Sequence, residues 1–282
     1  MAQRIVLNNQ QHDLAQSLLS SACEIAEQAG DLINSIYQQG DYQSEWKSDS
    51  TPVTSADYAA HHFLLEQLEK LTPDIPILSE EHAAIPLEKR AHWSRYWLVD
   101  PLDGTQEFVS GSGDFATELA LVENNQPVLG VVYGPVVGKR YSAVKGHGAS
   151  LRFQGKEQSI HSTHYATPPE RIRVATSRVQ NPALLQAILS GDFRYHLQPL
   201  GSASLKSCLV AEGLADCYIR IGPTGEWDTG APQIILQEAG GDLFDLQLQA
   251  LSYNQRESLE NPNFISLGDA SLPWHEILKR NH

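Results

Sequence analysis

Cysteine is scarce in this sequence, and the three that occur, Cys23, Cys208 and Cys217, form no Cys-x-x-Cys pair. An odd number without that spacing is typical of reduced, buried thiols in a cytoplasmic protein. The N-terminal segment MAQRIVLNNQQHD lacks the apolar stretch of a secretory signal, and no run of about 18 apolar residues occurs anywhere. A cytoplasmic protein without a transmembrane helix is therefore expected, although peripheral association with the inner membrane cannot be read from these features.

Basic residues are also few, since 20 lysines and arginines stand against 34 aspartates and glutamates, a formal net charge of −14. A surface this acidic repels phosphate backbones and anionic lipids, which argues against a nucleic-acid polymer or a membrane surface as the partner. The same charge would repel a small anionic substrate. Bound cations at an acidic site would remove that difficulty, because they invert the local charge.

Hydrophobic residues make up 41% of the 282 residues, which is enough for a large core and excludes a disordered chain. Apolar residues at every third or fourth position predict one helix over 13–38, with Asp13 as its N-cap, and another from Ser55 to about Leu71. Thr54 and Asp57 predict a capping box at the start of the second helix. Strands are expected at 75–78, 96–99, 116–122, 128–133 and 141–144.

A polar segment at 160–172, which contains Pro168-Pro169, predicts a domain boundary. Beyond it, predicted strands and helices alternate, and this pattern favours an α/β domain. These strands are expected at 172–176 and 216–221, and the helices at 181–189, 204–212 and 229–239. We therefore expect an N-terminal α+β domain over 1–165 and a C-terminal α/β domain over 166–282.

The segment Asp100-Pro-Leu-Asp103-Gly-Thr105 is the densest group of chemically useful residues, and it directly follows a predicted buried strand. Two carboxylates three residues apart can converge on one point, and Gly104 permits a sharp turn. Mg²⁺ prefers such oxygen ligands, and the carbonyl oxygen of Leu102 could add a third. The alternative is an ordinary turn in which the two aspartates only cap the backbone.

Two further segments carry acidic residues at predicted element boundaries. Glu80 follows the apolar run at 75–78, and Asp228 opens the helix that begins in Trp-Asp-Thr-Gly-Ala-Pro. Taken alone, Glu80 is a solvated surface residue and Asp228 an N-cap. Together with the segment at 100–105, they predict a site built from four carboxylates.

The combination Ser-Glu-Glu at 79–81, Asp-Pro-Leu-Asp-Gly-Thr at 100–105 and Trp-Asp-Thr-Gly-Ala-Pro at 227–232 resembles the inositol monophosphatase superfamily of lithium-sensitive, Mg²⁺-dependent phosphatases. This resemblance implies the layered α-β-α-β-α sandwich of the sugar phosphatases, an α+β to α/β fold, with two or three Mg²⁺ ions. It also implies the metal ligands, which are Glu80, Asp100, Leu102 through its carbonyl, Asp103 and Asp228.

Longer stretches resemble one branch of that superfamily, the 3'(2'),5'-bisphosphate nucleotidases of the CysQ type. They include SDSTPVTSAD at 48–57, RYWLVDPLDGTQEF at 95–108 and SLKSCLVAEGLADCYIR at 204–220. The likeness implies hydrolysis of 3'-phosphoadenosine 5'-phosphate, a by-product of sulfate assimilation, to AMP and phosphate. The substrate-binding residues it implies are Glu80, Leu102, Asp103, Gly104, Thr105, Ser204, Lys206, Arg220 and Asp228, where Ser204, Lys206 and Arg220 would bind the second phosphate.

The resemblance also implies a mechanism, in which a water molecule activated by the metals attacks phosphorus in line and no covalent phospho-enzyme forms. One ion would be held by Glu80, Asp100 and Leu102, and the other by Asp100, Asp103 and Asp228. Glu80 would also help to hold a third, weaker ion and so counts as a catalytic residue. Asp49 is expected to act as the general base through Thr105. A helix starting after Gly104 would add N–H donors for the phosphate.

Three segments depart from the branch: GSASLK at 201–206 is one residue longer than the related GSSLK, ATSRVQ at 175–180 lacks a histidine that relatives often have, and WDTGAPQ differs from WDTAAGH. These departures bear on nucleotide binding and leave the metal ligands untouched. An inositol or sugar monophosphatase therefore remains an alternative, followed by a non-catalytic metal- or nucleotide-binding protein. A nuclease is disfavoured by the net charge of −14. A homodimer is possible, since the superfamily often dimerises.

Overall fold

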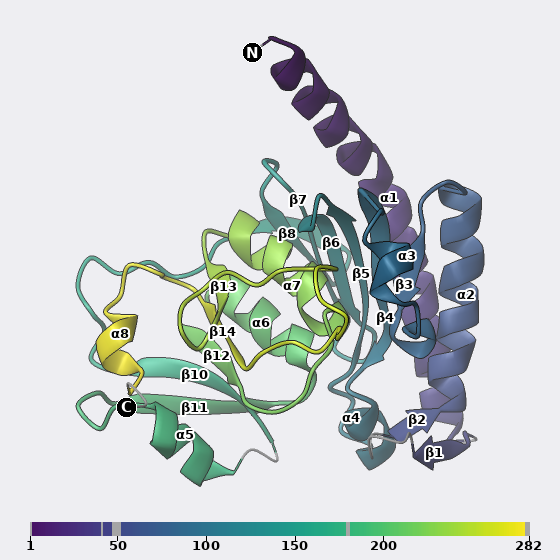
Figure 1. The fold of residues 1–282 in the computed structure, drawn as a ribbon. Helices are drawn as coiled ribbons and strands as arrows, with labels where there is room; N and C mark the ends of the chain where they lie inside the picture. The colour runs from purple at the N-terminus through teal and green to yellow at the C-terminus, as the bar shows by residue number, and fades with distance from the viewer. Residues whose placement is uncertain (1, 41, 47–51, 179–180, 280–282) are drawn as a thin grey trace.

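The computed structural model of this protein describes residues 2–40, 42–46, 52–178 and 181–279, which form two β-sheets with helices on their faces (Figure 1). Helices α1 (Ala2–Gln39) and α2 (Ser55–Leu71) cover one face of the larger sheet. The opposite face packs on α6 (Ala203–Ala211) and α7 (Trp227–Glu238), which also contact the smaller sheet.

The outer face of the smaller sheet is covered by α5 (Pro182–Ile188) and α8 (Trp274–Ile277). The order of layers is thus helix, sheet, helix, sheet, helix, and the predicted sandwich is confirmed. The apolar core between the two sheets draws residues from both halves of the chain, and further apolar cores lie between the other layers. The division into domains at residue 165 stays a prediction.

The larger sheet has seven strands in sequence order, and it is antiparallel except where β3 runs parallel to β4. Its strands are β3 (Ile77–Ser79), β4 (Arg95–Asp103), β5 (Ala116–Glu123), β6 (Gln126–Gly134), β7 (Lys139–Val144), β8 (Ala149–Phe153) and β9 (Lys156–Ile160). Because both faces are covered, β5 is buried along its whole length. The pairing of β4 with β5 shifts register between Asp100 and Asp103, which bends the end of β4.

The smaller sheet has five strands in the order β11-β10-β12-β14-β13. They are β10 (Ile172–Ser177), β11 (Tyr195–Leu200), β12 (Cys217–Arg220), β13 (Asp242–Asp245) and β14 (Phe264–Leu267). The first three run parallel to one another, whereas β14 is antiparallel to both of its neighbours. Parallel strands carry their carboxyl ends to the same edge, so the ends of β10, β11 and β12 lie together.

Short elements connect the sheets and helices near that edge. They are the two-stranded ladder β1 (Ser44–Trp46) and β2 (Pro52–Thr54), the 3₁₀ turn Glu80–His82, α3 (Leu87–Arg90) and α4 (Thr105–Ser110). The predicted capping box is confirmed, because the Thr54 side chain accepts from the N–H of Ala56 and the Asp57 carboxylate accepts from the N–H of Thr54 at 2.7 Å. The helix predicted after Gly104 is also present as α4.

The first helix was predicted to begin at Asp13, and this boundary is wrong. Helix α1 starts at Ala2 and passes through Asp13 without interruption. The segment before Asp13 contains no proline or glycine that would end a helix, so a potential cap residue was taken for a real one. Among the described helices, none is long and apolar enough to cross a bilayer.

Candidate active site

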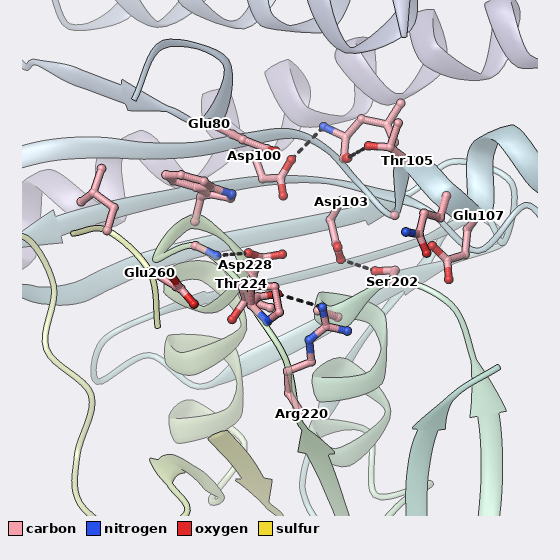
Figure 2. Close-up of a pocket in the computed structure, with 18 of the residues that line it drawn as sticks. Glu80, Asp100, Asp103, Thr105, Glu107, Ser202, Arg220, Thr224, Asp228 and Glu260 are labelled. Carbon is pink, nitrogen blue, oxygen red and sulfur yellow. Dashed lines mark hydrogen bonds between the residues drawn. The ribbon is translucent and has the colours of Figure 1, made fainter. Parts of the chain in front are cut away.

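The candidate site lies where β4 ends and α4 begins, beside the end of β12 and the start of α7 (Figure 2). Asp100 and Asp103 are almost completely buried, and the register shift between them lets both side chains approach the same point. The N–H of Leu102 donates to Oδ1 of Asp100 at 3.0 Å. Gly104 then turns the chain with a φ of 93°, where a Cβ atom would lie 3.0 Å from the carbonyl oxygen of Asp114.

Asp228 reaches this point from the other half of the chain, at the second position of α7. Its Oδ2 accepts from the N–H of Gly225 at 2.6 Å. One carboxylate oxygen each of Asp100, Asp103 and Asp228 can be chosen so that all three lie within 4.8 Å of one another. Three of the four predicted carboxylates therefore meet.

Glu80 joins them through sheet topology. It is the first residue after β3, whose last residue Ser79 pairs with Val99 of β4, so Glu80 lies beside Asp100. Burial, followed by the negative charges of Glu80 and Asp228, holds the pKa of Asp100 well above its usual range. Burial, Asp103 and Glu80 do the same to the pKa of Asp228. The four carboxylates thus repel one another strongly enough to favour protons or a cation among them.

This donor set fits a hard divalent cation. It consists of carboxylate oxygens, and the carbonyl oxygen of Leu102, which faces Thr105, lines the same cavity. Mg²⁺ and similar ions take oxygen ligands and often bind through a few carboxylates plus water. The cluster is therefore a group of side chains that could hold a divalent metal ion.

The Asp103 carboxylate is fixed by the start of α6. Its Oδ2 accepts from the backbone N–H of Ser204 at 2.9 Å, from the Ser204 hydroxyl at 2.8 Å and from the Ser202 hydroxyl. Ser202 is the N-cap of α6, and its φ of 53° lies in a region that residues other than glycine seldom adopt. These three donors leave Oδ1 of Asp103 for a cation. Ser204, predicted to bind the second phosphate, is fully buried behind Asp103 and does not line the cavity.

Thr105 forms a hydrogen-bonded pair with a residue that the sequence analysis did not assign to the site. Its hydroxyl lies 3.1 Å from Oδ1 of Asp57 and 3.3 Å from the carbonyl oxygen of Leu102. The Asp57 carboxylate also accepts from the hydroxyl of Thr54 at 2.6 Å, and burial raises its pKa to about 6. Asp49, the predicted partner of Thr105, lies outside the described residues.

A cavity of about 580 Å³ opens from the carboxylate cluster, large enough for a nucleotide-sized ligand. Lys206 and Arg220 line it, as predicted for residues near a second phosphate. The ammonium of Lys206 is buried, donates to the carbonyl oxygens of Ser202 at 2.6 Å and Leu200 at 3.2 Å, and lies over the ring of Tyr218. Burial lowers its pKa to about 8. Within the described residues, these two carbonyl oxygens use two of the three N–H donors of the ammonium.

Arg220 stands at the end of β12, on the Asp228 side of the cavity (Figure 2). One of its Nη atoms donates to the carbonyl oxygen of Pro223 at 2.9 Å, which fixes the guanidinium against the turn before α7. Its positive charge opposes the upward shift of the Asp228 pKa. Lys206 and Arg220 are the two basic residues among those that line the cavity in the described part of the chain.

Comparison with known proteins assigns this chain to a family. The model of the inositol monophosphatase family matches residues 14–272. The chain belongs to the inositol monophosphatase family. Within that family it is 44% identical to the 3'(2'),5'-bisphosphate nucleotidase CysQ of Aggregatibacter actinomycetemcomitans, over 95% of this chain and 99% of that protein. It is 42% identical to the protein of the same name from Escherichia coli K12, over 88% and 98%.

A solved family member has the same fold. The crystal structure of CysQ from Bacteroides thetaiotaomicron, a bacterial member of the inositol monophosphatase family, aligns with a TM-score of 0.76 at 34% identity. The alignment covers 90% of this chain and 97% of that one. The family assignment made from the three short motifs is therefore confirmed.

Sequence reasoning missed three residues that the fold brings to the cluster. Asp57 was explained as a capping-box residue, and that role concealed its bond to Thr105. Ser202 has a positive φ, and no local sequence pattern predicts it. Glu118 stands opposite Asp100 on β5, where burial and then the charges of Asp103 and Asp228 raise its pKa well above the usual range. A charged residue near the middle of a mostly apolar strand was the available signal for Glu118.

Proposed function

We propose that this protein is a Mg²⁺-dependent phosphomonoesterase that removes phosphate from a 3'(2'),5'-bisphosphate nucleotide, with 3'-phosphoadenosine 5'-phosphate as the substrate and AMP as the product. One observation carries the proposal: the carboxylate cluster and two cationic side chains, Lys206 and Arg220, line a single nucleotide-sized cavity. The names of two relatives, both 3'(2'),5'-bisphosphate nucleotidases, support the same class of substrate.

In this proposal each predicted ligand keeps its role. Glu80, Asp100 and the carbonyl of Leu102 would hold one ion, and Asp100, Asp103 and Asp228 a second. Bound divalent cations would neutralise the cluster, lower the pKa of water toward about 7 and stabilise the leaving oxygen. We assign these roles to Mg²⁺ in two or three copies, as in the superfamily that the motifs resemble.

The Thr105–Asp57 pair would remove the proton from the attacking water. Because the Thr105 hydroxyl donates to Asp57, its oxygen can accept a hydrogen bond from the water. The proton then passes along this pair to the Asp57 carboxylate, which acts as the general base. We therefore place on Asp57 the role first assigned to Asp49.

The charge of the cavity supports a requirement for metal. Its lining includes seven carboxylates, and Lys206 and Arg220 alone oppose them in the described residues. An anionic phosphate ester would be repelled from such a site until cations are bound. Substrate binding, and not only turnover, should therefore depend on the metal.

A substrate panel tests the function. Phosphate release is measured for 3'-phosphoadenosine 5'-phosphate, 3'-AMP and inositol 1-phosphate, with Mg²⁺, with EDTA and with added Li⁺. We expect kcat/KM for the bisphosphate to exceed the other two by about tenfold or more, and EDTA and Li⁺ to inhibit. A preference for inositol 1-phosphate would support the sugar-phosphatase alternative, and no metal-dependent release from any ester would support a non-catalytic binding protein.

Replacing Lys206 with methionine should weaken a bisphosphate much more than a monophosphate. The substitution keeps the contact with Tyr218 but removes the cation, so KM for 3'-phosphoadenosine 5'-phosphate should rise by about tenfold or more while KM for 3'-AMP changes little. Lys139→Met is the matched control, since Lys139 pairs with Glu212 away from the cavity. Equal losses on both substrates would remove Lys206 from the second-phosphate site.

The cellular location, the inhibition by lithium and the oligomeric state are also proposals. The three cysteines are buried and free of disulfides, which supports a cytoplasmic location. Inhibition by lithium and formation of a homodimer are expected from the superfamily.

A further inference from the structure

The segment 254–261, between β13 and β14, forms one wall of the cavity but has no part in the proposed chemistry. Glu257, Leu259 and Glu260 line the cavity, and Figure 2 shows Glu260 on the opposite side of the carboxylates from Glu107. The segment belongs to no helix or strand of the sheets, apart from an isolated bridge between Glu260 and Gly225. Its shape therefore depends on a few backbone hydrogen bonds to the turn before Asp228 and on side-chain contacts.

Arg90 makes four hydrogen bonds with the first residues of this segment. It is the last residue of α3, its side chain is fully buried, and its guanidinium donates to four oxygens. One Nη donates to Oδ1 of Asn254 at 2.7 Å, the other to the carbonyl oxygens of Arg256 at 2.7 Å and Glu257 at 2.6 Å, and Nε to that of Ile85 at 3.0 Å. A planar fork with five N–H donors suits this geometry, and a lysine ammonium cannot reproduce it.

Side chains of the segment also form hydrogen bonds with the backbone of α3. The Asn254 side chain donates to the carbonyl oxygen of Arg90 at 2.6 Å, and the Glu257 carboxylate accepts from the N–H of Leu87 at 3.3 Å. Asn254 has a φ of 55°, which directs its side chain and its backbone N–H to different partners. Asn254 and Glu257 therefore both bind the wall to α3.

The same segment also contacts the turn before Asp228. The backbone N–H of Asn254 donates to the buried carboxylate of Glu226 at 2.7 Å, and the N–H of Glu226 donates to the carbonyl oxygen of Leu259 at 2.9 Å. Arg90 could therefore act on the wall alone, or also on the carboxylate cluster through Glu226. These two effects differ in what they do to substrates of different size.

We propose that Arg90 is a positioning residue for the wall against which the organic part of the substrate binds, so that it governs affinity for nucleoside-sized leaving groups. The inference rests on the proposed phosphomonoesterase function. A phosphate ester of a small alcohol places its phosphoryl group at the carboxylates without reaching Glu257, Leu259 and Glu260. Its hydrolysis is therefore independent of Arg90.

The test compares a nucleotide with a small ester. KM and kcat are measured for 3'-phosphoadenosine 5'-phosphate and for glycerol 2-phosphate in Arg90→Lys and Asn254→Gly, with the unfolding temperature of each. Asn254→Gly retains the positive φ and the backbone bond to Glu226 while removing the side chain that Arg90 binds. Arg140→Lys is the control, because Arg140 is an equally buried arginine that pairs with Glu27 and Glu157 outside the cavity.

We expect KM for the nucleotide to rise about tenfold in both variants, a change that corresponds to the loss of one or two good contacts, while the glycerol ester changes less than about twofold. Arg140→Lys should change neither. Equal losses on both substrates, or a fall in kcat with a weaker response to Mg²⁺, would overturn the proposal and assign Arg90 to the cluster. If the wild-type protein hydrolyses neither ester, the proposed function itself fails.

Discussion

Replacing Asp103 with asparagine should lower Mg²⁺-dependent turnover by roughly 10³-fold or more, while the protein remains folded. The reason lies in the donors around this side chain. The backbone N–H of Ser204 can only donate, so the atom at the position of Oδ2 must be an oxygen. The asparagine amide nitrogen is then forced to face Asp100 and Asp228, where it offers two hydrogens and no lone pair.

The measurement pairs turnover with direct binding of Mg²⁺ by calorimetry and with the unfolding temperature. Asp216→Asn serves as the control, since Asp216 is equally buried but binds Arg173 and Tyr165 away from the cavity. Normal Mg²⁺ affinity and near-normal turnover in Asp103→Asn would contradict the assignment of Asp103 as a metal ligand. The unfolding temperature shows whether a loss of turnover comes from unfolding of the variant and not from loss of Mg²⁺ binding.

Replacing Thr105 with valine should lower kcat by roughly 10²–10⁴-fold without weakening Mg²⁺ binding, because the proton path from water to Asp57 is broken. Asp57→Asn should give a similar loss. Its amide oxygen can still accept from Thr54, so the capping box of α2 survives. Combining the two substitutions should cost little more than either, since residues that act as a unit are not additive.

The pH dependence of turnover provides a second test of the Thr105–Asp57 pair. Burial raises the pKa of Asp57 to about 6, and a general base must be ionised, so turnover should rise as pH increases through about 6. Protons also compete with cations at Asp100 and Asp228, whose pKa values are raised too. A higher Mg²⁺ concentration shifts that competition to lower pH but leaves the Asp57 inflection in place. A profile that stays flat between pH 5 and 8 would remove Asp57 as the base.

The carboxylate cluster could be predicted from the sequence because each of its residues adjoins a strong local boundary. Asp100 directly follows the apolar run at 96–99 inside β4, Glu80 follows β3, and Asp228 lies at the start of an apolar helix. Sheet edges and helix starts place side chains reproducibly, so a short motif there fixes geometry. The likeness to a known superfamily then joined the three segments.

Other features could not be read because their cause is long-range. The edge strands β9 and β11 were missed, since β9 is mostly exposed and polar and β11 contains Pro199, a residue that sheets accept at an edge. Their pairing depends on neighbours that the local pattern does not reveal. Asp57 was correctly read as a cap, yet its second partner, Thr105, becomes visible only when α2 packs beside α4.

The position of Asp228 has a consequence for how the protein acquires activity. Asp100 and Asp103 belong to the larger sheet and Glu80 directly follows its strand β3, whereas Asp228 belongs to a helix that both sheets enclose. Contacts between such distant segments close late in folding, because the loop entropy must be lost before they form. A nascent or partly folded chain therefore lacks the complete set of carboxylates. Tight binding of a metal ion should occur only once the whole chain has folded.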